Sequence, residues 1–338
     1  MNTCIIFGGQ GEEYFVSLSS VATILREIDT KKYNITKIGI TKDGKWYKTN
    51  ATPDEIENDK WQRDKERLYI DLENRVVIDS KNERIIIDKA FFVMHGDFGE
   101  NGTLQGLFDL LGIKYVGSDR GSSGVCYNKH LSKLIAMENG ILVSDFFAIK
   151  KCNLENVSTI LEKARNLTYP LFVKPSESGS SVGISRVENE NDLIDAIKNA
   201  FKYSSDVLLE RAIDGCECEI AVSELNGKII LSEVGKIVYE GSFYDYETKY
   251  KNNSVRYEIP AKIDTGVAEI IKNHAKTLFR ELNCHKIARI DFFVDKENRV
   301  IFNEINTMPG FTKSSMYPML MSHAGIEKTE LIDILLAE

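Results

Sequence analysis

ARIDFFV (residues 288–294) and VIFNEIN (residues 300–306) decide the fold of the C-terminal part of the chain. In both segments every second side chain falls on the same face of an extended backbone, so each predicts a β-strand. The short polar segment between them, DKENR (residues 295–299), predicts the turn of an antiparallel hairpin.

The register of this hairpin determines which side chains meet. If the turn centres on Lys296-Glu297, Arg289 pairs with Glu304. One face then carries Asp291, Glu304 and Asn306. Two carboxylates and an amide oxygen form a hard ligand set that suits Mg²⁺, which completes its shell with phosphate and water. The alternative interpretation is a solvated strand face with an ion pair.

The residues that follow the hairpin favour the metal site. TMPGFT (residues 307–312) predicts a rigid turn that leads from the carboxylates into a loop. Such a loop can present backbone N–H groups to an oxyanion, as a site for charged substrates requires.

The whole chain predicts an α/β protein that becomes α+β in its C-terminal part, with three domains. Residues 1–117 alternate strands and helices, and the polar stretch 42–84 interrupts them as an insertion. Residues 118–213 carry a Gly/Ser loop, and residues 214–338 contain hairpins and one long helix. The expected strands cover residues 4–7, 33–41, 90–94, 114–117, 171–174, 207–212, 220–225 and 228–232, and the expected helices cover 16–28, 103–111, 128–139, 191–203 and 267–282.

The Gly/Ser loop SGSSVG (residues 178–183) follows a strand that ends at Lys174. Small residues let the backbone approach a phosphate closely, and the lysine adds a point charge. A surface turn has the same composition, and the loop lacks the lysine at its end that a P-loop carries. Gly8-Gly9 is too short for a dinucleotide fingerprint, which argues against a Rossmann oxidoreductase.

Two further segments are candidates for substrate contacts. His95 lies at the carboxyl end of an expected strand, where open α/β sheets bind ligands, and this favours a substrate pocket over a structural histidine. YDYETKYK (residues 244–251) interleaves tyrosines with charges, and it suits a lid over phosphates or a solvated linker.

Composition excludes several classes of protein. The chain has 338 residues, 43% of them hydrophobic, which is enough for a large core and too many for a disordered or collagen-like chain. Its net charge of -8 opposes nucleic acid as a partner. Six scattered cysteines suit reduced thiols in the cytoplasm. No apolar run is long enough for a membrane span or a signal peptide, so a soluble cytoplasmic protein is expected.

Taken together and in order, several motifs resemble those of the D-alanine–D-alanine ligases, which have the ATP-grasp fold. The resemblance runs from about residue 4 to about residue 325. The insertion at residues 42–84 resembles the longer form of the family, to which the vancomycin-resistance ligases belong. The motifs are HG…GENGTLQG (95–106), VKP…GSSVG (173–183), FYDY…KY (243–250), IPA (259–261), ARIDF (288–292) and NEINTMPGFT (303–312).

The resemblance implies that the chain binds ATP and two Mg²⁺ ions, with Mn²⁺ as a possible replacement and K⁺ as a possible activator. Lys129 and Lys174 are expected on the phosphates, Glu210 at the adenine edge and Glu217 on the ribose. The other expected ATP contacts are Ser181, Arg211, Ile213 and Lys249, and the expected metal ligands are Asp291, Glu304 and Asn306.

The resemblance also implies roles around D-alanine. Arg289 and the Gly310 N–H are expected to stabilise the oxyanion, and Glu13 to hold the first amino group, with His95 at the same pocket. Glu13, Ser180 and Tyr250 match a triad that orders the lid and places or deprotonates the attacking amine. The second substrate is expected to contact Tyr244, Ser315 and Met316.

The chain departs from the family pattern at four positions. Where relatives usually have Glu-His-Glu-Val-Ser, it has Glu13-Tyr14-Phe15-Val16-Ser17, and it has asparagine rather than aspartate at 101 and 128. Lys249-Tyr250 favours an amine over lactate as nucleophile, and the apolar Met316 favours D-alanine over D-serine.

Several alternatives remain beside D-alanyl-D-alanine synthesis for peptidoglycan. They are a D-alanine–D-serine ligase, a ligase for another carboxylate and amine, and a nucleotide-binding regulatory homologue that lacks turnover. The expected partners are small molecules only, without nucleic acid or membrane, and the expected assembly is a homodimer.

Overall fold

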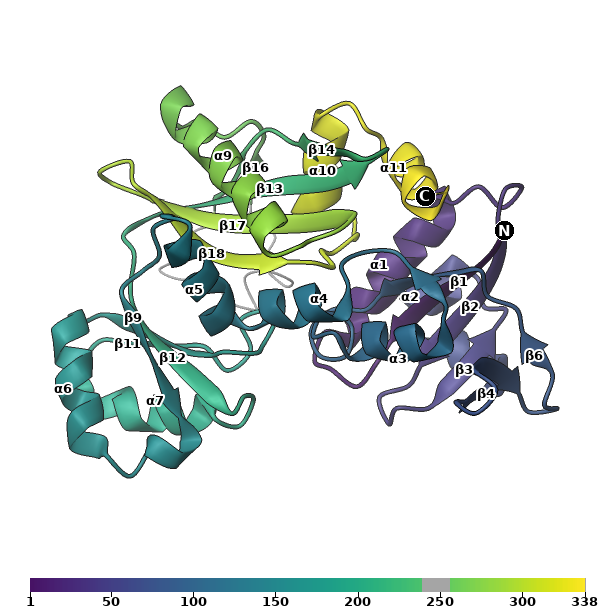
Figure 1. Ribbon diagram of the computed structural model, residues 1–338, viewed down its shortest axis with the longest axis horizontal. Helices are drawn as coiled ribbons and strands as arrows, with labels where there is room; N and C mark the ends of the chain where they lie inside the picture. Colours follow the sequence, from purple (N-terminus) through teal and green to yellow (C-terminus); the bar gives the residue numbers. More distant parts are fainter. Residues whose placement is uncertain (239–255, 338) are drawn as a thin grey trace.

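A computed structural model describes residues 1–238 and 256–337, and three β-sheets organise them (Figure 1). Tyr244, Lys249 and Tyr250 lie outside the described residues. The arrangement of these sheets and helices confirms the predicted fold class, α/β with an α+β C-terminal part. The domain boundaries at 117 and 213 stay a prediction.

The N-terminal sheet has the strand order β6-β5-β4-β3-β2-β1-β7-β8. Strand β1 pairs in parallel with β2 and β7, and β7 with β8, whereas the remaining pairs are antiparallel. The elements are β1 (Asn2–Gly8), α1 (Tyr14–Glu27), β2 (Asn34–Ile40), β3 (Trp46–Thr49), α2 (Pro53–Glu57), β4 (Lys65–Asp71), β5 (Val76–Asp79), β6 (Arg84–Ile85), β7 (Lys89–Val93), α3 (Thr103–Leu111) and β8 (Lys114–Tyr115).

The polar stretch 42–84 continues this sheet instead of forming a separate unit. Strands β3 to β6 add to the edge of β2, and Trp61 between α2 and β4 is fully buried. Its ring lies against Gly39 of β2, where an added Cβ would be 2.5 Å from the ring. The segment is polar because it covers one edge of the sheet, and Trp61 is its anchor to the core.

A four-stranded antiparallel sheet with the order β11-β10-β12-β9 lies at the other end of the molecule (Figure 1). Buried residues of α6 and α7 pack on its core. Its elements are β9 (Phe146–Lys150), α6 (Val157–Leu167), β10 (Leu171–Pro175), β11 (Ser185–Val187), α7 (Leu193–Ala200) and β12 (Asp206–Arg211).

The C-terminal sheet is antiparallel in its main order β16-β15-β13-β17-β18, with β14 paired to β13. Helix α9 packs against it, and helices α4 and α5, which precede β9 in sequence, contact β18. The elements are α4 (Arg120–Tyr127), α5 (Lys129–Glu138), β13 (Gly215–Leu225), β14 (Lys228–Leu231), β15 (Gly235–Val238), β16 (Arg256–Glu258), α9 (Thr265–Glu281), β17 (Ile287–Asp295) and β18 (Val300–Asn306).

The expected register of the last hairpin is wrong by up to two residues. Val294 pairs with Val300 around a turn in which Asn298 has a left-handed φ of 61°. A bulge then shifts the register, so that Asp291, and not Arg289, lies opposite Glu304. The shared face is nevertheless confirmed, because Arg289 now lies opposite Asn306 and the Asn306 amide donates to Asp291 at 3.1 Å.

The two C-terminal helices belong to the N-terminal core. Helices α10 (Met316–His323) and α11 (Lys328–Ala337) bury Leu320, Leu331 and Leu335 in the same cluster as Phe7 and Leu18. Figure 1 shows α11, in yellow, beside α1, in purple. The chain therefore returns from the C-terminal sheet to its own beginning.

We expect Leu335→Ala to lower the free energy of unfolding by about 3 kcal/mol, because Leu335 is fully buried in this cluster. Leu110→Ala is the matched control, since Leu110 is 63% exposed, and it should change stability by less than about 0.5 kcal/mol. Urea unfolding measures both. Equal effects of the two substitutions would contradict the packing of α11 into the N-terminal core.

Candidate active site

Three carboxylates lie side by side on the face of the C-terminal sheet. Glu219 of β13 pairs with Asp291 of β17, and Asp291 pairs with Glu304 of β18. Directly opposed residues of antiparallel strands share a face, so the three side chains form a row across three strands. The sequence predicted Asp291 and Glu304 but missed Glu219, whose position on this face follows only from the pairing of β13 with β17.

Arg289 lies within this row of carboxylates. Its Nε and terminal nitrogen each donate to Asp291 at 2.8 Å, and its Nε lies 3.1 Å from a Glu219 oxygen. Burial by itself would lower the pKa of Arg289, but Asp291 and Glu219 raise it well above its ordinary value. Arg289 is therefore a fixed positive charge whose orientation is set by two carboxylates.

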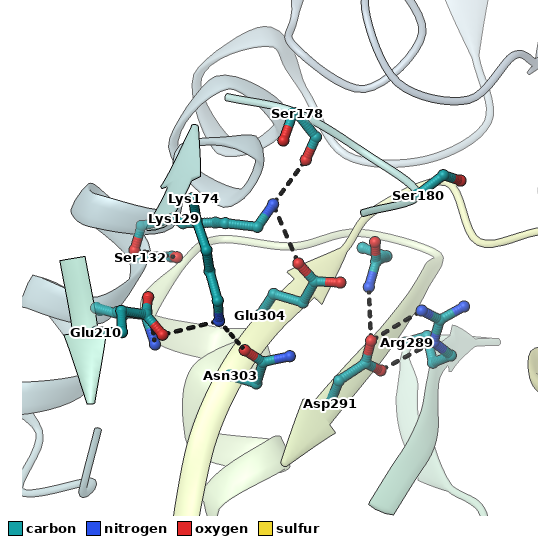
Figure 2. A network of polar contacts seen from close by, with 12 residues as sticks. Lys129, Ser132, Lys174, Ser178, Ser180, Glu210, Arg289, Asp291, Asn303 and Glu304 are labelled. Atoms are coloured by element: carbon teal, nitrogen blue, oxygen red, sulfur yellow. Dashed lines mark hydrogen bonds and ion pairs between the residues drawn. The ribbon is translucent and has the colours of Figure 1, made fainter. Parts of the chain in front are cut away.

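Two lysines approach the same face from the opposite side (Figure 2). Lys129, at the start of α5, donates to the Ser178 carbonyl at 2.6 Å and lies 3.1 Å from Glu304. Lys174 of β10 donates to Glu210 at 2.8 Å and to Asn303 at 3.3 Å. Glu304 pairs with Asp291 and Phe302 pairs with Phe292, so Asn303 is the extra residue of a β-bulge. The bulge lets Asn303 point to the same side as its neighbour Glu304 (Figure 2).

A buried charge cluster surrounds Glu210, and the sequence missed one of its members, Lys133. The Lys133 ammonium is 3.4 Å from one Glu210 oxygen, while Lys174 holds the other and Ser144 donates to it at 3.1 Å. Burial lowers the pKa of Lys133 to about 8. Burial would raise the pKa of Glu210, but Lys133 and Lys174 lower it to about 2. The i, i+4 spacing of Lys129 and Lys133 on one helix face was the available signal.

Glu13 and the Gly/Ser loop meet although they come from different sheets. Glu13 is the N-cap residue of α1 but its side chain makes no cap hydrogen bond, and its carboxylate accepts from the Ser180 hydroxyl. A Cβ at Gly179 would lie 2.3 Å from a Glu13 oxygen, so a side chain there would displace the Glu13 carboxylate. Ser180 and Ser181 both have left-handed φ values, 46° and 60°, which bring the loop backbone toward Glu13.

His95 connects the N-terminal sheet to the TMPGFT loop. Its Nδ1 bonds the Met308 carbonyl at 2.9 Å and its Nε2 the Ser20 hydroxyl at 3.0 Å. Burial alone would lower the pKa of His95, but Glu100 and Glu13 raise it above its ordinary value. His95 therefore lies at the predicted pocket and at the same time holds the loop in place.

The TMPGFT loop and the start of α10 close the site. Ser315 accepts from the Thr312 N–H at 2.9 Å, and its hydroxyl lies so near Gly310 that a Cβ there would be 2.7 Å away. Met316 is buried, with its sulfur near Gly235.

One cavity of about 110 Å³ joins these groups. Residues from the N-terminal sheet, the Gly/Ser loop, the C-terminal sheet and α10 line it together. They include Glu13, His95, Ser180, Glu219, Arg289, Glu304, Asn306, Gly310, Ser315 and Met316.

The remaining ATP-contact predictions lie toward the edge of this arrangement. Glu217 is two residues before Glu219 on β13, so both point to one face, and Glu217 is half-buried. Arg211, at the end of β12, pairs with Asp145 at 3.0 Å, and Ile213 follows in the link to β13. Their contacts with a nucleotide stay a prediction.

The donor set fits Mg²⁺ better than a metal that needs an all-protein cage. Within residues 1–238 and 256–337, no group of three or more His, Cys, Asp and Glu side chains is arranged to hold a metal ion. Asp291, Glu304 and Asn306 provide two carboxylates and an amide, which leaves further positions to phosphate and water. Mg²⁺ is bound in this way in phosphate-handling sites.

Family models decide the identity of the chain. The model described as D-ala D-ala ligase N-terminus matches residues 2–118, and that described as D-ala D-ala ligase C-terminus matches residues 135–337. The chain belongs to the D-alanine–D-alanine ligase family.

Curated members of the D-alanine–D-alanine ligase family match over nearly the full length. The D-alanine–D-alanine ligase of Caldicellulosiruptor bescii is 39% identical, covering 100% of this chain and 94% of the relative. That of Clostridium acetobutylicum is 40% identical, covering 98% and 96%.

Solved structures of D-alanine–D-alanine ligase family members have the same fold, which confirms the expected ATP-grasp architecture. The VanG D-Ala:D-Ser ligase from Enterococcus faecalis has a TM-score of 0.90 at 35% identity, covering 99% of this chain and 98% of the other. The D-alanine–D-alanine ligase from Coxiella burnetii has a TM-score of 0.84 at 30% identity, covering 100% and 94%.

The Glu210 cluster of this D-alanine–D-alanine ligase family member makes stability depend on pH in the acid range. The pKa of Glu210 is about 2 in the folded chain, below its ordinary value of 4.5, so its stabilisation is complete above the ordinary value and lost as the pH falls toward the folded one. Glu210→Gln should therefore flatten the loss of melting temperature between about pH 5 and about pH 2. Glu224→Gln, at a partly exposed position, is the control and should keep the wild-type slope. Identical slopes for all three proteins would contradict the assignment.

Proposed function

We propose that this chain joins two molecules of D-alanine into D-alanyl-D-alanine at the expense of ATP, as a step in peptidoglycan precursor synthesis. Its membership of the ligase family supports the activity. One observation assigns the activity to this site. The Glu13 carboxylate, the Arg289 guanidinium and Glu304, a proposed metal ligand, line the same cavity. An amino acid needs an anion for its amine and a cation for its carboxylate, and the cavity offers both.

The reaction proceeds in two steps. The γ-phosphoryl group of ATP passes to the carboxylate of the first D-alanine, which gives an acyl phosphate and ADP. The amine of the second D-alanine attacks the acyl carbon, the bond to the phosphate oxygen breaks, and phosphate leaves while the amine loses a proton. Glu13 binds the first amino group, and Ser180, bonded to Glu13, and Tyr250 place or deprotonate the second amine.

Charge stabilisation comes from residues that are already oriented. Arg289 and Gly310 line the same cavity, and we assign the guanidinium and the Gly310 N–H to stabilising the oxyanion that forms when the amine attacks. Ser315 takes the carboxylate of the second substrate. His95 and Tyr244 border the substrates.

The nucleotide lies between the four-stranded and the C-terminal sheets. Lys129, Lys174, Ser181 and Lys249 contact the phosphates, while Glu210, Arg211, Ile213 and Glu217 contact the adenosine. Lys129 pairs with Glu304 and Lys174 with Glu210, so phosphates would compete with these carboxylates for both cations.

Asp291, Glu304 and Asn306 would hold Mg²⁺, which would neutralise phosphate charge during transfer. We propose two ions, with Mn²⁺ as a substitute and K⁺ as a possible activator. A homodimer and a cytoplasmic location complete the proposal. No helix within residues 1–238 and 256–337 is long and apolar enough to cross a membrane.

A D-alanine–D-serine ligase is the second candidate, because the VanG ligase is among the similar structures. The buried and apolar Met316 argues against it, since a serine hydroxyl finds no hydrogen-bond partner in that side chain. A homologue without turnover is disfavoured by Arg289, which two carboxylates hold in an orientation suited to an oxyanion.

Product identification tests the proposal. Purified protein with Mg-ATP is given D-alanine alone, D-alanine with D-serine, or D-alanine with D-lactate, and products are identified by mass. We expect D-alanyl-D-alanine, ADP and phosphate from D-alanine alone, and the same dipeptide to dominate both mixtures. A dominant mixed product would reject the specificity argument, and ATP binding without any product would favour the regulatory homologue.

We expect Glu13→Gln to lower kcat/KM for D-alanine by about 10- to 100-fold, the loss of one charge-assisted hydrogen bond. Glu12→Gln, the exposed neighbour, is the matched control. Initial rates of phosphate release measure both. Unchanged activity of Glu13→Gln would point to a different amine anchor and hence to another carboxylate–amine ligase.

We expect Asp291→Asn to raise the Mg²⁺ concentration for half-maximal rate by about tenfold or more, because one of two carboxylate ligands loses its charge. Glu297→Gln, on the turn of the same hairpin, should leave it unchanged. Calorimetric titration with Mn²⁺ in the presence of a non-hydrolysable ATP analogue gives a readout that is independent of turnover. Wild-type Mn²⁺ affinity in Asp291→Asn would exclude Asp291 as a ligand.

A further inference from the structure

The first turn of α1 carries two residues that the proposed reaction leaves without a role, Tyr14 and Phe15. They follow Glu13 directly, so any movement of their backbone moves the carboxylate. Tyr14 is buried, whereas Phe15 is 54% exposed. Both side chains face the segment 42–84, as their contacts show.

Tyr14 is held by two polar groups of that segment. Its hydroxyl donates to the Asp59 carboxylate at 2.7 Å and accepts from the Trp61 indole N–H at 3.0 Å. Trp61 is itself fixed, since it is fully buried and packs edge-on against Phe7 with ring centroids 5.3 Å apart. The phenol is thus bonded to a part of the core that cannot shift easily.

The rings add a second set of contacts to the same segment. Tyr14 and Phe15 pack edge to face at 5.3 Å, and the Lys42 ammonium lies 4.9 Å from the Tyr14 ring and 4.2 Å from the Phe15 ring. A lysine over an aromatic face is attracted by the ring quadrupole. Contacts from Lys42, Asp59 and Trp61 therefore converge on the first turn of one helix.

The start of α1 has no side-chain cap. Glu13 is the N-cap residue but makes no side-chain cap hydrogen bond, and the Tyr14 N–H donates to the Gly11 carbonyl at 3.3 Å. The next turn is anchored separately, because the Ser17 hydroxyl accepts from the Gly8 N–H at 2.8 Å and donates to the Val93 carbonyl. An uncapped helix start depends on outside contacts for its position.

We propose that Tyr14, bonded to Asp59 and Trp61, is a positioning residue for Glu13, so that the segment 42–84 is part of the first-substrate site. This inference rests on the proposed function, in which Glu13 binds the first amino group. A carboxylate that also contacts Ser180 and lies close to Gly96 and Gly179 has little room to adjust, so a small displacement of its backbone weakens substrate binding.

Kinetics of Tyr14→Phe and Asp59→Gly test the proposal, since glycine tolerates the left-handed φ of 54° at position 59. We expect the KM for the first D-alanine to rise about tenfold in both variants. This KM is obtained from the rate as a function of D-alanine concentration. The KM for ATP should change less than about twofold, because no ATP contact is touched. Asp59→Asn keeps a side-chain oxygen as acceptor and should restore wild-type behaviour. Asp59 is at the surface, so its variants serve if Tyr14→Phe fails to fold.

Tyr33→Phe is the matched control for lost stability. Tyr33 is also buried in the N-terminal core and donates to an aspartate, Asp333, at 2.8 Å, but it lies away from Glu13. We expect Tyr33→Phe to lower the melting temperature by a similar amount and to leave the KM for the first D-alanine unchanged. If Tyr14→Phe and Tyr33→Phe raise this KM equally, the role of Tyr14 is structural and the proposal is overturned.

Two readouts separate the inference from the proposed function. In a Glu13→Gln background, Tyr14→Phe should add less than about a twofold further loss, because the group it positions is gone. Hydrogen exchange of residues 11–17 should accelerate in Tyr14→Phe and not in Tyr33→Phe, whether or not dipeptide forms. Absence of dipeptide from the wild type would reject the function alone, whereas unchanged exchange or full additivity would reject the positioning role.

Discussion

The accumulation of negative charge on one sheet face is the constraint that organises the rest of this site. Glu219, Asp291 and Glu304 occupy directly paired positions on β13, β17 and β18. Buried like charges repel strongly in a medium of low polarity, so they persist only with cations close by. Arg289 supplies one cation from within the sheet, and Lys129 supplies another from α5. The cations that neutralise this face are those suited to receive phosphates and an oxyanion.

Positions of these cations depend on contacts between parts of the chain that are far apart in sequence. His95 and Ser20 of the N-terminal part bond the TMPGFT loop through Met308 and Phe311. Helices α10 and α11 pack into the N-terminal core, which fixes the C-terminal sheet against it. The four-stranded sheet reaches the site through Ser180 and Lys174. The cavity exists only where the three sheets meet, which is why no single segment contains it.

Part of this arrangement could be predicted from residue order alone. Alternation puts Arg289 with Asp291 on one side of β17 and Glu304 with Asn306 on one side of β18, but the register decides whether the two pairs share a face. The predicted face is right because the bulge makes the pairing differ from the expected one by two residues at Arg289, and a two-residue shift preserves the face. The pairing was not predictable, since a bulge and the length of the turn change the register without changing the pattern. Glu219 and Lys133 were missed for a related reason: each acquires its place from a tertiary contact, with β17 and with Glu210 respectively.

The departures from the family pattern become intelligible from the same contacts. Asn101 and Asn128 stand where relatives usually have aspartate, and each uses its side-chain oxygen to accept a backbone N–H, from Thr103 and from Leu131, both at 3.0 Å. Asparagine and aspartate serve nearly equally in such helix-start positions, because the carbonyl oxygen makes the bond in either case. Asn128 caps α5, the helix whose next residue is Lys129. The substitution thus removes a negative charge beside Lys129, the lysine that we propose contacts phosphate, while keeping the cap that begins its helix. Lys129 has one anionic neighbour fewer as a result.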